Sequence, residues 1–224
     1  MNFITAAFNI NTVFFTVFDY QMSYLEFFGT IFNIWCVWLT TRAKILSWPV
    51  GLLGSILYLF LFYQIQLYSD VFEQLYFIIT GAVGWFMWVH LKKDINQADK
   101  TVVVGVNSIK KNIQFIAILI FGTALLTYLA VNLTRWLPEY FPEPASFPIL
   151  DAFTTVMSFV AQWLLIRKKV ESWVLWILVD IIGIWLYWYK GVKFISLEYV
   201  LFLIMATAGL FNWLKLYKLR TKTI

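Results

Sequence analysis

The chain has 224 residues and a formal net charge of +5, and 62% of it is hydrophobic while only 13% is charged. Soluble domains are nearer half apolar and a quarter charged, so the composition indicates a membrane protein. The positive charge then indicates loops that face the cytoplasm, in preference to a nucleic-acid partner.

The first 22 residues form a separate aromatic segment. Five phenylalanines occur in residues 1–18, and no charge precedes Asp19. The segment is too short to span a membrane, and it lacks the basic start of a signal peptide. We expect an amphipathic helix over residues 1–22 that lies on the membrane surface or packs against the other helices.

Seven long apolar stretches follow, each of the length that a membrane-spanning helix needs. They cover residues 24–41, 48–67, 71–91, 112–134, 147–166, 171–190 and 196–217. Because a chain in lipid must satisfy its backbone groups internally, we expect an all-α membrane protein with seven transmembrane helices. The proline-rich residues 137–148 are the clearest loop.

Basic residues predict the orientation of these helices. With the N-terminus outside, 14 of the 17 lysines and arginines fall on inside segments. The exceptions are Arg135, Lys190 and Lys193. Cytoplasmic loops carry an excess of Lys and Arg, so we expect the N-terminus outside and the C-terminus in the cytoplasm.

An internal repeat appears when the chain is shifted by 125 residues. Residues 26–93 then align with residues 151–218 without a gap, and 19 of the 68 pairs are identical. The identities include Trp, Arg, Glu and Gly, which two apolar sequences would rarely share by chance in one register. Self-similarity at a fixed offset indicates two copies of one structural unit.

Each repeat holds three spans, and one linker span lies between them, so both repeats have the same orientation. This 3+1+3 arrangement of parallel repeats is that of SWEET transporters, whose substrate site lies near the midplane between the repeats. We therefore expect five segments in chain order. They are an interfacial helix (1–22), a first repeat (23–93), a middle segment with cytoplasmic loop, linker helix and periplasmic loop (94–146), a second repeat (147–218) and a cytoplasmic tail (219–224).

Polar residues recur on one face of two spans. On the fifth span they are Asp151, Thr155, Ser158 and Gln162, and on the first they are Glu26, Thr30 and Asn33. Their spacing of three or four residues places each set on one helix face. Hydroxyl groups often join helices by hydrogen bonds, and that alternative stays open for Ser and Thr. For Asn33 and Gln162 we favour a cavity.

Asp180 stands in the most aromatic span, "SWVLWILVDIIGIWLYWYK". A buried acid must be paired, protonated or solvated, so Asp180 either holds the helices in register or lines a cavity. Trp173, Trp176, Gly183 and Tyr187 share its helix face. Indole rings beside an acid suit a flat cationic ring, through stacking and cation–π attraction.

The repeats differ at several polar positions, as an asymmetric ligand would require. The second repeat has Asp180, Asn212 and Gln162 where the first has Ser55, Met87 and Val37, and the first has Gln74 where the second has Tyr199. We expect spans three, five, six and seven to share one cavity. The candidate binding residues are Glu73, Gln74, Gln162, Trp176, Asp180, Trp185, Tyr199 and Asn212. A helix-end amide is the alternative for Asn212, and helix capping is the alternative for Glu73.

Three motifs resemble the PnuC-type nicotinamide riboside transporters. They are "WPVGLLG", "LYSDVFEQLYFIITGAVGWFMW" and "AQWLLIRKKVESWVLWILVDIIGIWLYWYKG", and the resemblance covers residues 24–218. Ser69, Phe72 and Glu73 depart from the residues usual in that family. Glu73 is therefore a candidate for a property special to this chain.

The resemblance implies facilitated uptake of nicotinamide riboside, for NAD biosynthesis, across a bacterial inner membrane, with the N-terminus in the periplasm. It also implies a homotrimer, downhill transport, and trapping of the substrate by a separate cytoplasmic kinase. The candidate residues agree with this substrate, because the riboside carries a cationic aromatic ring and a hydroxylated ribose. No phosphate-binding glycine loop is present, which agrees with a substrate that lacks phosphate.

Other classes of function fit less well. A SWEET-like sugar transporter, or a transporter of another vitamin or nucleoside, would share the fold, but a sugar needs no acid beside aromatic rings. An enzyme would need a nucleophile with a base, or a metal set. The single cysteine, Cys36, and the single histidine, His90, provide neither. We expect no catalytic residues, no metal and no cofactor.

Overall fold

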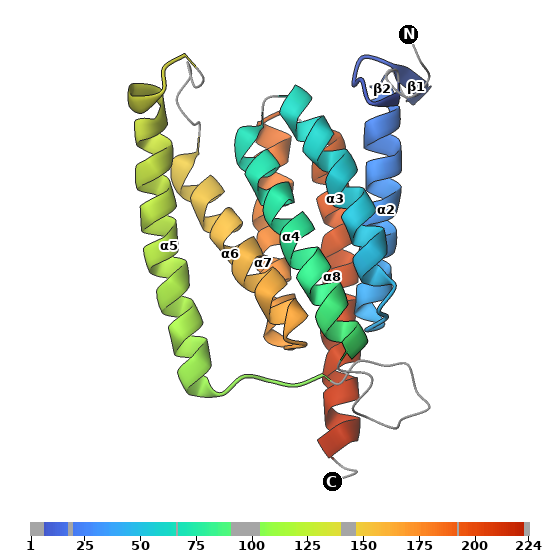
Figure 1. Cartoon of the computed structure of the whole chain (residues 1–224), viewed down its shortest axis with the longest axis vertical. Coiled ribbons are helices and arrows are strands. Elements are labelled where there is room, and N and C mark those ends of the chain that lie inside the picture. Colours follow the sequence, from blue (N-terminus) through green and yellow to red (C-terminus); the bar gives the residue numbers. More distant parts are fainter. Residues whose placement is uncertain are drawn as a thin grey trace. The chain divides into compact units, whose positions relative to one another are not determined.

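The computed structural model describes residues 7–17, 20–65, 67–90, 104–139, 147–191 and 193–221. Two strands precede seven long helices along the chain (Figure 1). The elements are β1 Val13–Val17, β2 Tyr20–Ser23, α2 Tyr24–Thr41, α3 Ser47–Gln64, α4 Tyr68–His90, α5 Ile109–Trp136, α6 Pro148–Ile166, α7 Glu171–Tyr189 and α8 Lys193–Thr221.

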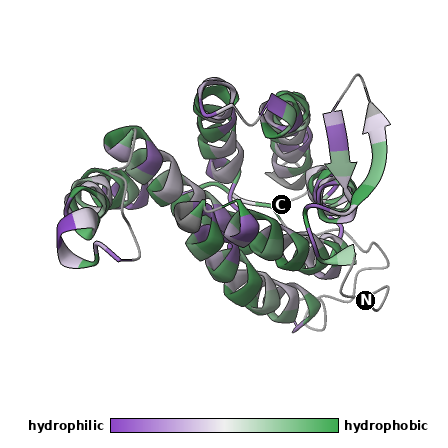
Figure 2. Cartoon of the chain, turned by 90° about the horizontal axis from the view of Figure 1, so that it is seen from above, coloured by the Kyte–Doolittle hydropathy of each residue, from purple (hydrophilic) through white to green (hydrophobic). Residues whose placement is uncertain are grey.

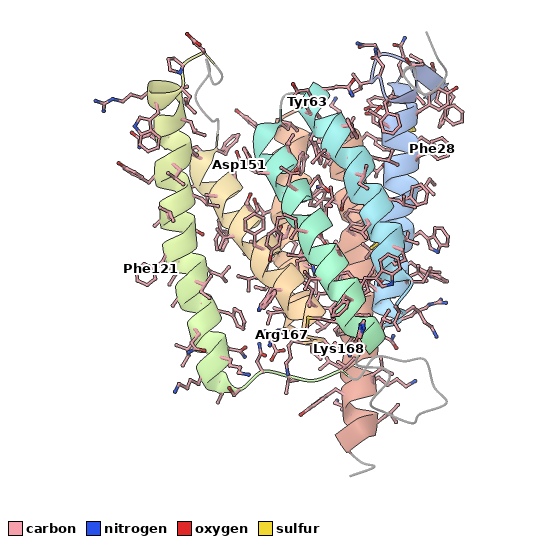
Figure 3. The ribbon with its side chains drawn as sticks, viewed as in Figure 1. Phe28, Tyr63, Phe121, Asp151, Arg167 and Lys168 are labelled. Atoms are coloured by element: carbon pink, nitrogen blue, oxygen red, sulfur yellow. The ribbon has the colours of Figure 1, made fainter. Side chains whose placement is uncertain are left out.

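The seven helices coincide with the seven expected spans. Six of them, all but α2, are long and apolar enough to cross a membrane by length and composition. Helix α2 has only 18 residues and includes Glu26 and Asn33, which lower its apolar content. Hydrophobic residues predominate along the helices in Figure 2, and Phe28, Tyr63 and Phe121 are among the outward-facing rings in Figure 3. These apolar outer faces fit contact with lipid.

The N-terminal segment corrects one prediction. Strands β1 and β2 pair as an antiparallel hairpin, so the surface helix expected over residues 1–22 is wrong for the paired residues. β-Branched and aromatic residues such as Val13, Phe15 and Thr16 favour a pleated strand. The phenylalanines of this segment had instead been interpreted as the apolar face of a helix. Residues 1–6, 18 and 19 of the expected helix lie outside the described residues, as do residues 91–103 of the loop before α5.

The hairpin leads directly into α2. Ser23 caps the helix by accepting from the backbone of Glu26, and the Glu26 carboxylate accepts from the Ser23 backbone. This reciprocal pair satisfies two donors that a helix N-terminus leaves open. Glu26 also accepts a hydrogen bond from the Tyr20 hydroxyl of β2. Glu26 is therefore occupied in holding the hairpin to the helix.

The described residues divide into two compact units. The first comprises residues 1–104 and 204–224, and the second comprises residues 105–203. In the first, α3 packs against α2 and α4; in the second, α6 packs against α5 and α7. Helix α8 contributes its N-terminal part to the second unit and its C-terminal part to the first.

The two turns that follow α2 and α6 have the same local structure. Ala43 and Lys168, which are 125 residues apart, both adopt a left-handed backbone with φ of 52° and 60°. Ser47 and Ser172 each donate a 2.8 Å hydrogen bond to the carbonyl three residues earlier. The bounds of α2 and α3 also recur in α6 and α7 at that offset, within one residue. The sequence repeat is therefore also a repeat of local structure.

One feature of the second turn has no counterpart in the described part of the first. Gly105 forms a parallel bridge with Lys169, and Asn107 donates its backbone N–H to Glu171 at 2.7 Å. The residues just before α5 thus cover the turn between α6 and α7. Burial of Lys168 in this turn lowers the pKa of its ammonium group.

Candidate functional site

Asp180 lies in the middle of α7 and is only 3% exposed. Within the described residues, its carboxylate makes no hydrogen bond or ion pair. Trp176 and Gly183 lie one turn to either side on the same helix face, and Trp176 is half-buried. A buried carboxylate without a partner is costly, so this part of α7 is suited to receive a polar or cationic group.

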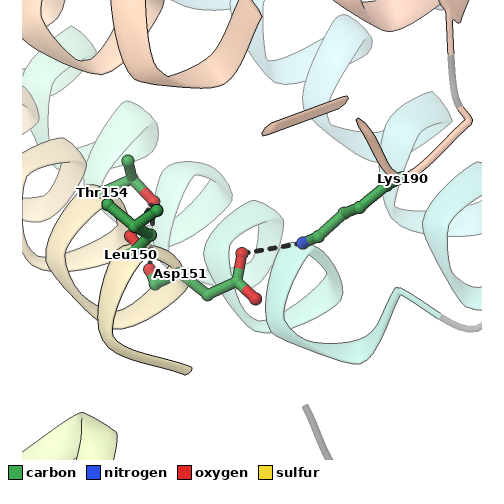
Figure 4. Close-up of polar contacts among 4 residues, drawn as sticks. All are labelled: Leu150, Asp151, Thr154 and Lys190. Atoms are coloured by element: carbon green, nitrogen blue, oxygen red, sulfur yellow. Dashed lines mark hydrogen bonds and ion pairs between the residues drawn. The ribbon is translucent and has the colours of Figure 1, made fainter. Parts of the chain in front are cut away.

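The polar stripe on α6 serves two purposes. At its first turn, the Asp151 carboxylate accepts a 2.7 Å salt bridge from the Lys190 ammonium at the end of α7 (Figure 4). Figure 3 shows Asp151 at one end of α6, and Arg167 and Lys168 at the other. Further along, the Gln162 side chain is buried, and among the described residues it has no hydrogen-bond partner. The stripe therefore begins with a structural ion pair and ends in an uncommitted amide.

Tyr199 of α8 belongs to the same unit as Asp180. Its ring lies directly on Gly183, so closely that a Cβ on this glycine would collide with two ring atoms. The ring centroid is 5.1 Å from that of Tyr187, which is buried. Gly183 and Asp180 share a helix face, so Tyr199 lies within one helical turn of the carboxylate.

Trp185 has different surroundings from the other candidates in this unit. Its ring is 49% exposed and stacks on Tyr189 with a centroid distance of 5.7 Å. Phe147 packs edge-on against the same ring. Residues five apart on a helix point about 140° away from each other, so Trp185 faces away from Asp180. This placement favours an anchor at the membrane interface.

Three candidates lie in the first unit. Gln74 of α4 is buried, and no described residue makes a hydrogen bond with its side chain. Glu73 beside it is half-buried. Asn212 of α8 donates a 2.6 Å hydrogen bond to the Thr41 carbonyl, and Trp213 donates one to Thr40 at 3.0 Å. These bonds attach α8 to the end of α2 and favour the structural alternative for Asn212.

The contact of Gly183 with Tyr199 could not be read from the sequence. There the glycine appears only as a member of the Asp180 face, whereas in the structure the Tyr199 ring lies directly on it. The repeat alignment held a signal, because it pairs Gly183 with Tyr58 and Tyr199 with Gln74. Both exchanges involve a tyrosine at one position and a smaller or polar residue at its equivalent.

No metal centre competes with this interpretation in the part of the chain that the structure describes. There, no three side chains of the His, Cys, Asp and Glu types lie close enough together to hold an ion. The candidate residues instead provide carboxylate, amide and aromatic groups. They can bind a solute through hydrogen bonds, charge and stacking.

Comparison with known proteins identifies the family. A sequence profile described as "Nicotinamide mononucleotide transporter" matches residues 23–215. The chain belongs to this family. As in the sequence resemblance, PnuC-type proteins are among its relatives, and that prediction is confirmed.

Relatives of the chain share about a quarter of the aligned residues with it. The nicotinamide riboside transporter PnuC of Escherichia coli (strain K12) is 28% identical over 87% of both chains. The protein of the same name from Neisseria mucosa is 29% identical over 88% of this chain and 74% of its own. The riboflavin/roseoflavin transporter RibM of Streptomyces davaonensis is 25% identical over 91% of both.

The fold agrees with a solved structure of the family. The crystal structure of the vitamin B3 transporter PnuC matches with a TM-score of 0.69 and 27% sequence identity. The match covers 87% of this chain and 82% of the other. The chain is therefore a multi-pass membrane protein of a transporter family.

Proposed function

We propose that this protein carries nicotinamide riboside across a membrane by facilitated diffusion, as a uniporter. The single observation that carries the proposal is Asp180, a buried carboxylate without a partner among the described residues. It lies one turn from Trp176 and from the Tyr199 ring. A permanently cationic aromatic ring would supply a positive counter-charge for this carboxylate and would stack on the adjacent rings.

Transporters with that substrate in their names support this assignment, since they align with most of this chain. The riboflavin/roseoflavin transporter RibM is also a relative, so a flavin is the second candidate. The isoalloxazine of riboflavin is neutral and would leave the Asp180 charge uncompensated. The carboxylate therefore favours the riboside, and neither observation favours a sugar.

The proposed architecture is a pair of parallel three-helix repeats joined by α5. The recurrence of helix bounds and of the turns at Ala43 and Lys168 supports it. The distribution of Lys and Arg supports a periplasmic N-terminus and a cytoplasmic C-terminus. An inner-membrane location, a homotrimer and a separate kinase that traps the product complete the proposal by analogy with the family. No catalytic step is assigned to the chain itself.

In the proposed binding mode, Asp180 and nearby rings hold the pyridinium, while buried amides bind the ribose and carboxamide. Gln162, in the same unit as Asp180, is the stronger amide candidate, because its side chain has no hydrogen-bond partner within the described residues. Gln74 likewise has no such partner, and with Glu73 and Asn212 it is a separate candidate of the first unit. Removing one stacking ring should cost about 1–3 kcal/mol of binding free energy.

Calorimetry on the purified protein tests the function. Nicotinamide riboside should bind at least about tenfold more tightly than riboflavin, nicotinamide mononucleotide, thiamine or glucose. Tighter binding of riboflavin would assign the second candidate. No measurable binding of the riboside would refute the proposal.

The role of Asp180 requires its own variant. Asp180→Asn keeps the size of the side chain and removes its charge, so we expect weaker riboside binding in a protein that still folds. Trp185→Phe is the matched control, because the Trp185 ring faces away. Unchanged affinity together with a lower melting temperature would instead make Asp180 structural.

A further inference from the structure

In each repeat a tyrosine ring packs on a glycine of a neighbouring helix, but the two contacts use different helices. In the first repeat, Tyr58 projects from the middle helix α3 and lies on Gly29 of α2. Its ring centroid is 5.3 Å from that of Phe62, one turn along the same helix. The ring thus packs between the first two helices of its repeat.

In the second repeat, the ring comes from the third helix. Tyr187 is the equivalent of Phe62 at the 125-residue offset, and its ring partner is Tyr199 of α8 at 5.1 Å. The position equivalent to Tyr58 is Gly183, on which the Tyr199 ring lies. The two repeats have therefore exchanged the positions of a ring and a smaller residue.

This exchange is not needed for packing alone. The first repeat shows that a tyrosine on the middle helix fills the slot beside Phe62 and also bonds its hydroxyl to Thr30 at 2.7 Å. The second repeat carries the ring on α8 instead, and it is also the repeat that has Asp180 where the first has Ser55. The Tyr199 ring of α8 lies on Gly183, which is one turn from the acid on α7.

The exchange changes what surrounds the carboxylate. A ring on α7 itself would point from the Asp180 face toward the neighbouring helix α6, as Tyr58 points toward α2. Because Gly183 has no side chain, the Tyr199 ring of α8 can lie against that face of α7. The result is an aromatic surface on one side of the Asp180 carboxylate, which fits one cationic ring.

We propose that Gly183 is a positioning residue for substrate binding: its missing side chain lets the Tyr199 ring lie on α7 beside Asp180, where it contacts the cationic ring of the substrate. This inference rests on the proposed function and adds the structural feature that positions the Tyr199 ring. The first repeat also has a glycine under a tyrosine ring, Gly29 under Tyr58, at other positions of the repeat. This pair provides a control with the same kind of contact.

The test compares Gly183→Ala with Gly29→Ala, using riboside affinity by calorimetry and melting temperature. A Cβ would strike a tyrosine ring at either position, so both variants should melt at lower temperature. Only Gly183→Ala should weaken riboside binding, with a dissociation constant raised roughly tenfold to a hundredfold. Gly29→Ala should stay within about twofold of wild type.

A double-mutant cycle shows whether Gly183 acts through the ring. Tyr199→Leu should weaken binding to a similar extent, and adding Gly183→Ala to it should cause no further loss, because the ring that is displaced is already gone. A full additional loss in that background would overturn the proposal. If Gly183→Ala alone does not fold, Tyr199→Leu decides, and wild-type affinity in that variant would overturn the proposal.

The outcomes separate this inference from the proposed function. If wild type binds the riboside and Gly183→Ala binds equally well, only the positioning role is wrong. If wild type itself binds no riboside, the proposed function is wrong and the positioning role falls with it.

Discussion

Thr30 and Tyr58 join α2 to α3 through hydroxyl groups that lie 2.7 Å apart in a buried position. The Tyr58 ring reaches this position because Gly29 has no side chain in its way. For Thr30 the sequence left two alternatives open, a cavity or a hydrogen bond between helices. The buried hydroxyl pair favours the hydrogen bond between helices.

Tyr58→Phe removes this hydrogen bond and keeps the ring. We expect a loss of about 1 kcal/mol in the free energy of unfolding, since single hydrogen bonds between membrane helices contribute about that much or less. Melting of the purified protein in detergent measures the change. Tyr63→Phe, at a position that is 63% exposed, is the control and should melt like wild type. A change in riboside affinity with unchanged melting would contradict the structural role.

The Lys190–Asp151 salt bridge should contribute little to stability. Both side chains are 18% exposed, so solvent screens the pair, and Lys190→Met should cost no more than about 1 kcal/mol. The loss should shrink as salt is raised, because ions screen the wild-type pair. Melting temperatures at low and high salt test this, with Lys110→Met at an exposed position as control. A large loss that does not depend on salt would show a buried pair instead.

Tyr20 should make the hairpin sensitive to alkali. Burial of the phenol, followed by its hydrogen bond to Glu26, raises the pKa of Tyr20. Its pKa is raised in the folded state, so the unfolded chain ionises first, and stability present below about pH 10 is lost as pH rises further. Tyr20→Phe should melt below wild type at pH 8, and the gap should narrow above pH 10. A gap that stays constant with pH would contradict the shift.

The C-terminus should lie in the cytoplasm, because 14 of 17 basic residues then fall on inside segments. Alkaline phosphatase, which is active only outside the cytoplasm, should be inactive when fused after residue 224. The same enzyme fused in the loop after α5, near Leu137, should be active. The reverse pattern would invert the assignment of every loop.

Transport should need no coupling ion. The described residues contain no cluster of acidic side chains able to hold a cation, and a single Asp180 faces the proposed substrate. Proteoliposomes should therefore equilibrate the riboside without a Na⁺ or H⁺ gradient. Accumulation above the outside concentration that an ionophore abolishes would show coupling.

The sequence by itself determined the number, order and approximate bounds of the seven helices, and also the repeat. The reason is that a helix in lipid satisfies its backbone within its own segment, so each apolar run carries enough local information. The buried state of Asp180, Gln74 and Gln162 also followed from polar residues placed inside apolar runs.

Sequence periodicity did not reveal strand pairing or the contacts between helices. The aromatic residues before Tyr20 suggested an amphipathic helix, but a hairpin forms, because strand pairing depends on a partner segment that periodicity does not reveal. Asn212 was a candidate for substrate binding, and its bond to Thr41 depends on where α8 meets the end of α2. No pattern within α8 encodes that meeting.

Only the tertiary structure decided which ring lies on Gly183, one turn from Asp180. The sequence offered Trp176 and Trp185 from the same helix, and their spacing separated the faces to which they belong. It did not show that Tyr199 of α8 lies on Gly183, because contact across helices depends on crossing geometry and on the space that a missing side chain leaves. In a membrane, where helices do not associate by the hydrophobic effect, such close packing determines how they meet.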